Sequence, residues 1–138
     1  MTPPVQARLS GAVVLLCAVV VFGCFGHAMT FDHLRDVDRV EVRTNHDKLL
    51  KTIQDAAVIA AAQAAVARHD LGWSTPWYGT PVPRLQVNFY KAGQLLGGYG
   101  VGIDFLTTDP GPTFMSRAIT HSEALQIAAT VGVPLPSE

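Results

Sequence analysis

The chain has 138 residues, of which 49% are hydrophobic, and 10 basic side chains balance 11 acidic ones. This near-neutral charge argues against a nucleic-acid partner, which requires a clustered basic face. Both cysteines, Cys17 and Cys24, precede residue 28. The rest of the chain therefore folds without an internal disulfide.

The N-terminal segment is apolar from Leu9 to Phe25, and Arg8 carries the only charged side chain before Asp32. A short basic start followed by an apolar core is typical of an export signal. We therefore expect residues 1–28 to be a signal peptide or membrane anchor. The part that follows would lie outside the cytoplasm, in the periplasm of a bacterial cell envelope.

Three fates of this segment stay open. Small residues in Gly26-His27-Ala28 would allow cleavage after Ala28 and secretion. Val21-Phe22-Gly23-Cys24 resembles the bacterial lipobox, in which Cys24 would be lipidated, although Phe22 departs from the usual residue. The uncharged run of about 18 residues is at the lower edge of the length that spans a bilayer, which would allow a retained anchor.

Residues 29–37 are polar and of mixed charge, which predicts a short tether before a single domain over residues 38–138. Arg39 to Thr44 alternates in the manner of a strand with one buried face. Asn45 to Lys48 is prone to form a turn.

Residues 46–54 permit two interpretations. Helical spacing of apolar residues would allow one helix from His46 to Arg68. Alternatively, Leu49 to Ile53 is a second strand, and Asp55 caps a helix over Ala56 to His69. We favour the second interpretation, because the charges before Asp55 are dense and the alanine-rich block after it has high helix propensity.

Residues 70–83 contain three prolines and two glycines and predict a loop. Its three large aromatic residues, Trp73, Trp77 and Tyr78, could form a stacking platform for a sugar or a peptide. The alternative is that both tryptophans fill the core. We expect Trp73 to be buried beside the helix end, and Trp77 with Tyr78 to be at least partly exposed as partner-binding residues.

The C-terminal half predicts three strands and a helix. Thr120 to Glu123 forms a capping box for a helix that ends at Gly132. The resulting order, ββαβββα, predicts an α+β fold with a small antiparallel sheet and two helices on one face. The three predicted strands are 85–90, 95–107 and 113–119.

The order of these elements resembles small uncharacterised exported domains and lipoproteins of bacteria. The resemblance depends on Thr52-Ile53-Gln54-Asp55 before an apolar helix, a tryptophan, the extended Val87-Asn88-Phe89-Tyr90 and a glycine turn. It covers residues 39–133 and implies the architecture and an envelope location. It implies no activity, cofactor or active-site residue.

No residue pattern indicates a cofactor or a metal. The glycines of Gly97 to Gly102 do not have dinucleotide-binding spacing and predict a bulged or strongly twisted strand. The five histidines include no pair with the helical spacing of a zinc protease. His121, Ser122 and Glu123 are sequence neighbours, whereas a catalytic triad is assembled from distant segments.

These observations predict an exported, membrane-tethered domain that acts by binding an envelope protein, a peptide or a glycan, without catalysis. One alternative is a small hydrolase-like enzyme that uses Asp104 or His121. The other is a purely structural accessory subunit. The oligomeric state stays open.

Overall fold

The computed structural model describes residues 28–108 and 113–137. The predicted signal or anchor segment, including Cys24, therefore lies outside the described residues except for Ala28. Between residues 28 and 108 and between 113 and 137, no helix is long and apolar enough to cross a membrane.

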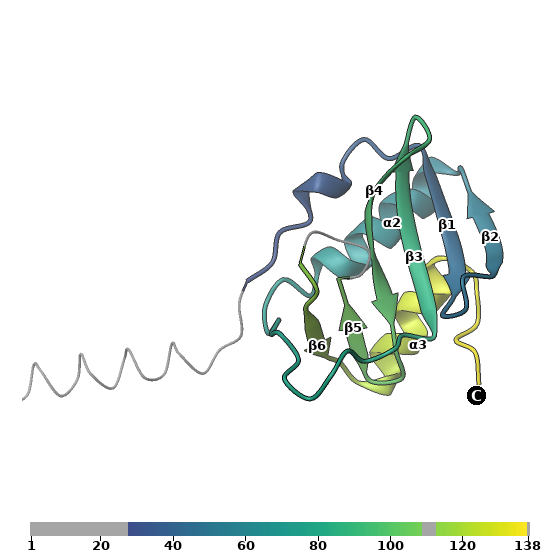
Figure 1. Ribbon diagram of the computed structural model, residues 1–138. Coiled ribbons are helices and arrows are strands. Elements are labelled where there is room, and N and C mark those ends of the chain that lie inside the picture. Colours follow the sequence, from purple (N-terminus) through teal and green to yellow (C-terminus); the bar gives the residue numbers. More distant parts are fainter. Residues whose placement is uncertain (1–27, 109–112, 138) are drawn as a thin grey trace, which may run out of the picture.

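A six-stranded antiparallel sheet forms one layer of the molecule, with the strand order β2-β1-β3-β4-β5-β6. Both helices lie on the same face of this sheet, behind it in the view of Figure 1. The predicted class, α+β with two helices on one side of an antiparallel sheet, is confirmed for the described residues. The elements are β1 (Arg39–Thr44), β2 (Leu49–Ile53), α2 (Ala56–Ala67), β3 (Leu85–Lys91), β4 (Gln94–Val101), β5 (Phe105–Thr107), β6 (Ser116–Ala118) and α3 (His121–Thr130).

The element order ββαββββα differs from the predicted ββαβββα. The stretch 95–107, predicted as one strand, is interrupted by a tight turn between β4 and β5. The amide of Gly102 donates to the carbonyl oxygen of Phe105 at 2.8 Å. A Cβ at Gly102 would lie 2.3 Å from the Phe105 ring, so this turn requires glycine.

The glycine-rich part of β4 allows a close approach to β3, as predicted. The register between the two strands shifts between Phe89 and Tyr90. A Cβ at Gly98 would lie 2.2 Å from the carbonyl oxygen of Val87. The glycines of β4 therefore serve strand packing.

The favoured interpretation of residues 46–54 is confirmed. Leu49–Ile53 pairs with β1 as strand β2. The Asp55 carboxylate accepts hydrogen bonds from the amides of Ala57 and Val58 at 2.9 and 3.1 Å, and so caps α2. The helix ends at Ala67, two residues before the predicted end.

The core lies between the sheet and the two helices. Alternate residues of the strands face the helices because successive side chains of a strand point to opposite faces. The buried Tyr99 of β4 donates from its hydroxyl to the Ala62 carbonyl oxygen of α2 at 3.1 Å. The strands contribute Val40, Val42, Leu85, Val87, Phe89, Tyr99, Val101 and Leu106, and α2 contributes Ile59, Ala62, Ala65 and Val66.

The predicted capping box opens α3. The Thr120 hydroxyl accepts from the Glu123 amide at 3.2 Å, and the Glu123 carboxylate accepts from the Thr120 amide at 2.7 Å. Gly132, with a φ of +66°, follows the helix end.

Within residues 29–37, Met29, Phe31, Leu34 and Val37 pack against the domain core, while the role of this stretch as a tether stays a prediction. The stretch includes the short 3-10 helix η2 (Asp32–Leu34). Leu34 is buried, and its carbonyl oxygen accepts a hydrogen bond from the Gln63 side chain of α2. Phe31 and Leu34 lie three residues apart, so one turn of the 3-10 helix places both side chains on the side that faces the domain.

Candidate functional site

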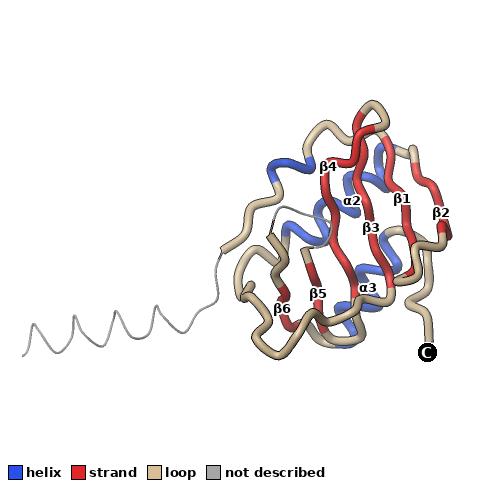
Figure 2. The backbone as a smooth tube through the Cα atoms, viewed as in Figure 1, coloured by secondary structure: helices blue, strands red, loops and turns tan. Residues whose placement is uncertain are grey.

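The candidate site is the loop between α2 and β3, which we call the aromatic loop and define as residues 71–83. Figure 2 shows it as a tan tube that runs beside β5 and β6. It contains no charged residue, since Asp70 and Arg84 flank it. Its two ends are held by specific contacts, and its middle is exposed.

Trp73 anchors the first part of the loop. Its side chain is fully buried, and the indole nitrogen donates to the His69 carbonyl oxygen at 2.5 Å. The Phe31 ring packs against it, with 5.9 Å between ring centroids. Ser74 then pairs with Ser116 through two backbone hydrogen bonds of 2.9 Å, which protect the outer edge of β6.

Pro83 anchors the other end of the loop. It is buried over β4, where a Cβ at Gly100 would lie 2.6 Å from Cγ of Pro83. The amide of Arg84 donates to the Val101 carbonyl oxygen at 2.9 Å. The Arg84 guanidinium also donates to the Pro136 carbonyl oxygen at 2.8 Å. The loop is therefore fixed on both sides of its exposed middle.

The middle of the loop presents two aromatic side chains to solvent. Trp77 is 92% exposed and Tyr78 is 69% exposed. Their rings are perpendicular, with an interplanar angle of 87° and 5.7 Å between centroids. Aromatic pairs prefer such an edge-to-face arrangement. The expected split between a buried Trp73 and an exposed Trp77 is confirmed, whereas partner binding by Trp77 and Tyr78 stays a prediction.

Leu71 and Val82 also belong to this surface, although the sequence did not predict them there. They are 60% and 65% exposed, so apolar exposure extends along most of the loop. The absence of charged residues from 71–83 is the feature of the sequence that could have identified Leu71 and Val82 as part of this surface.

A second cluster, next to the start of the loop, contains titratable groups. The Arg117 guanidinium lies 2.7 Å from Nδ1 of His69 and donates to the Leu71 carbonyl oxygen. Burial and the nearby charge of Arg117 lower the pKa of His69, so the ring is neutral and Nδ1 accepts the hydrogen bond. Through the hydrogen bond from Arg117, this cluster holds the backbone at the start of the aromatic loop.

The residues of the hydrolase alternative are engaged elsewhere. Nδ1 of His121 lies 3.1 Å from the Ile103 carbonyl oxygen, which it contacts as a donor. Asp104 is exposed in the turn between β4 and β5, not on a strand. Asp104 lies in that turn and His121 is the first residue of α3, and within the described residues no hydrogen bond or ion pair joins their side chains. Hydrogen bonds from Thr120 lower the pKa of Glu123, which is held as the helix cap.

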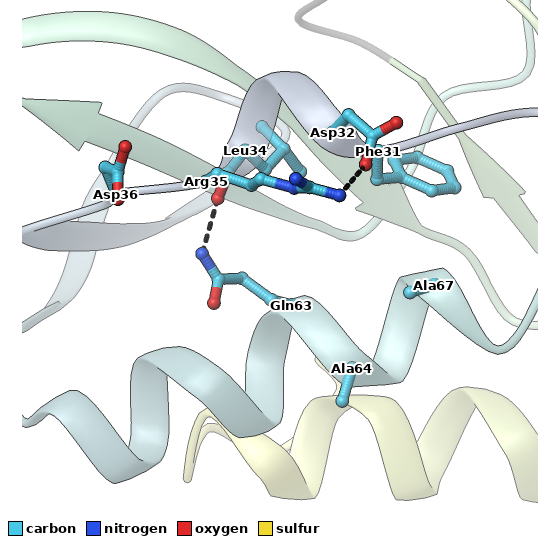
Figure 3. A pocket seen from close by; sticks show the side chains of 8 residues that line it. All are labelled: Phe31, Asp32, Leu34, Arg35, Asp36, Gln63, Ala64 and Ala67. Carbon is cyan, nitrogen blue, oxygen red and sulfur yellow. Dashed lines mark hydrogen bonds and ion pairs between the residues drawn. The ribbon is translucent and has the colours of Figure 1, made fainter.

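Two hollows on the surface include polar side chains in their linings. One, of about 500 Å³, lies between η2 and α2 and is lined by Asp32, Arg35 and Gln63 among others (Figure 3). There Arg35 and Asp32 form an ion pair at 2.5 Å, and Gln63 binds the backbone of Leu34. The other, of about 530 Å³, is lined by His46 and Lys48 of the β1–β2 turn, by Val82 of the aromatic loop with Arg84, and by C-terminal residues.

Neither hollow combines a nucleophile with a base at hydrogen-bond distance among the described side chains. A search of residues 28–108 and 113–137 for three or more His, Cys, Asp or Glu able to hold a metal ion finds no such group. The aromatic loop is therefore the most distinctive surface that the structure describes.

Comparison of the chain with protein-family models, with curated proteins and with solved structures finds no match. The resemblance to small exported domains of bacteria accordingly stays a prediction.

Proposed function

We propose that this chain is an exported domain, tethered to a membrane of the bacterial envelope through its N-terminal segment, that acts by binding and not by catalysis. The aromatic loop is the contact surface. Its partner is another component of the envelope, with a protein, a peptide or a glycan as the sequence-based expectation.

The exposure of Trp77 and Tyr78 carries this proposal. Large aromatic side chains provide much contact area at a low cost in conformational entropy, and they are enriched where proteins bind partners. Here they stand on a loop whose ends are fixed by Trp73 and Pro83. A surface that is already ordered loses little further freedom when a partner binds.

The hydrolase alternative has weaker support. Catalysis by acid and base requires two titratable side chains that converge on one substrate position. His121 donates to a backbone carbonyl, and Glu123 caps α3. The alternative of a purely structural subunit would also require a contact at the exposed aromatic pair, because another subunit would then cover it.

Site-specific photocrosslinking in cells that produce the full chain tests the proposal. A photoreactive phenylalanine derivative replaces Tyr78 in one variant and Leu49 in a control. Leu49 is 46% exposed on β2, at the sheet edge opposite to β6. We expect an adduct with an envelope component from position 78 and none from position 49.

Equal adducts from both positions, or none from position 78, would contradict binding by the aromatic loop. The readout is neutral with respect to the partner, because protein, glycan and lipid adducts are separated by mass and by digestion.

A further inference from the structure

Apolar exposure in this molecule is concentrated in the aromatic loop. Among the described large hydrophobic residues, the four most exposed are Trp77, Tyr78, Val82 and Leu71, at 92, 69, 65 and 60%. No other exceeds 47%. A wholly uncharged stretch with exposed Trp and Tyr has a composition found both at the core of protein interfaces and at lipid interfaces. The position of the loop relative to the N-terminal segment decides between the two.

The loop begins where the N-terminal chain enters the domain. The backbone amide of Met29 donates to the carbonyl oxygen of Asp70 at 2.7 Å. Phe31, two residues after Met29, packs on Trp73, three residues after Asp70. Figure 1 shows the first described residues and the loop that follows α2 on the same side of the domain, beside β5 and β6.

Chain length limits how far the loop can lie from the apolar segment. Phe25 ends the apolar stretch, and three residues separate it from Met29, so four Cα-to-Cα steps join the two. Four extended residues span at most about 14 Å. If the segment reaches the bilayer, Asp70 lies within about this distance of its apolar end, and Leu71 follows directly. Lipidation of Cys24 would set a similar limit on the distance between the start of the loop and the bilayer.

We infer that the aromatic loop is a second membrane contact, with Trp77 and Tyr78 in the interfacial region of the bilayer beside the N-terminal anchor. This inference rests on the proposed function, because it requires the tether, and it names the bilayer, in place of the expected protein, peptide or glycan, as the envelope component that the loop contacts. Tyrosine and tryptophan favour this region since one part of each ring system is apolar and another can donate a hydrogen bond to water or head groups.

Two attachments would orient the domain on the membrane. The start of the loop pairs with β6 through Ser74, and Val82 near its end lines a hollow with His46 and Lys48 of the β1–β2 turn. The side of the domain that bears the middle of the loop would then face the bilayer. Because the loop carries no charge, its insertion does not depend on anionic lipid.

Tryptophan fluorescence of the full chain in phosphatidylcholine vesicles tests the inference, since Trp73 and Trp77 are the only tryptophans. The vesicles contain lipids brominated at a shallow position of the acyl chain, which quench nearby indoles. Trp77→Phe is the matched variant, because it keeps an aromatic ring and leaves the buried Trp73 as the only emitter. We expect quenching in the wild type that Trp77→Phe removes.

Quenching that is unchanged in Trp77→Phe would overturn the inference. So would quenching that requires phosphatidylglycerol, because that result would assign the contact to charge.

Sedimentation of the same vesicles separates this inference from the proposed function. A chain that stays in the supernatant overturns both the tether and the membrane contact. A chain that sediments without quenching dependent on Trp77 overturns the membrane contact alone. The loop would then be left for a protein, a peptide or a glycan, which photocrosslinking at position 78 identifies.

Discussion

Trp73 and Trp77 lie four residues apart in one loop, yet the first is fully buried and the second is 92% exposed. The difference arises from their neighbours. Trp73 fills the space between Phe31 and the end of α2, where its indole nitrogen finds the His69 carbonyl oxygen. Among the described aromatic rings, Tyr78 is the only one within stacking distance of Trp77.

The two tryptophans should differ in their contribution to stability. Trp73→Ala removes a buried ring and should lower the free energy of unfolding by about 3–5 kcal/mol. Trp77→Ala should change it by no more than about 0.5 kcal/mol, as surface substitutions do. Denaturant unfolding of both variants measures the difference. Equal large losses would show that Trp77 is a core residue and would remove the basis for binding by the loop.

Gly100→Ala should loosen the C-terminal end of the aromatic loop. The added methyl would lie 2.3 Å from Oγ1 of Thr107 and 2.6 Å from Pro83, so overpacking should cost about 1–3 kcal/mol. We expect faster protease cleavage within residues 71–83.

Gly93→Ala is the control for this change. A methyl group added at Gly93 would meet no atom within 4 Å. Gly93 lies in the turn between β3 and β4, where only its φ of +79° opposes the substitution. Cleavage of the loop that is equally fast in both variants would contradict a specific role of the contact between Gly100 and Pro83.

Stability should fall as His69 becomes protonated. Burial, and then the charge of Arg117, lower the pKa of His69 below its ordinary value of 6.5. The folded state thus binds the proton less tightly than the unfolded state. The contribution of neutral His69 to the free energy of unfolding is therefore complete above pH 6.5, and it is lost as the pH falls through the lower, folded-state pKa. NMR titration of the imidazole should give a midpoint below 6.5.

His69→Asn serves as the reference for this titration. Its side-chain oxygen can still accept from Arg117, but it does not titrate in this range. The gap in melting temperature between wild type and variant should change with pH between neutrality and the folded-state midpoint. A constant gap would show that His69 titrates as it does in the unfolded chain.

The full chain should fractionate with membranes through its N-terminal segment. Metabolic labelling with a fatty acid, compared between wild type and Cys24→Ala, distinguishes a lipid anchor from a retained apolar helix. Label in the wild type alone indicates lipidation, and membrane association of both proteins without label indicates the helix. A soluble wild-type protein that begins at Met29 would show cleavage and contradict the tether.

Local patterns explain the parts of the fold that could be predicted. Alternation in 39–44 and 85–90 identifies strands because a strand turns successive side chains to opposite faces. Asp55 and Thr120 mark helix starts because the cap bonds to amides only two or three residues away. The break at Gly102 was not predicted, since it depends on the Phe105 ring folding over that glycine.

The sequence by itself determined the α+β class, both helix starts and the charge-free character of residues 71–83, because periodicity, capping and composition are local properties. Only the tertiary structure decided that Phe31 packs on Trp73, that Leu34 is buried, and that Met29 bonds to Asp70. These features depend on contacts between segments far apart in the chain. Such contacts form only when the sheet and both helices share one core, and local residue patterns contain no record of them.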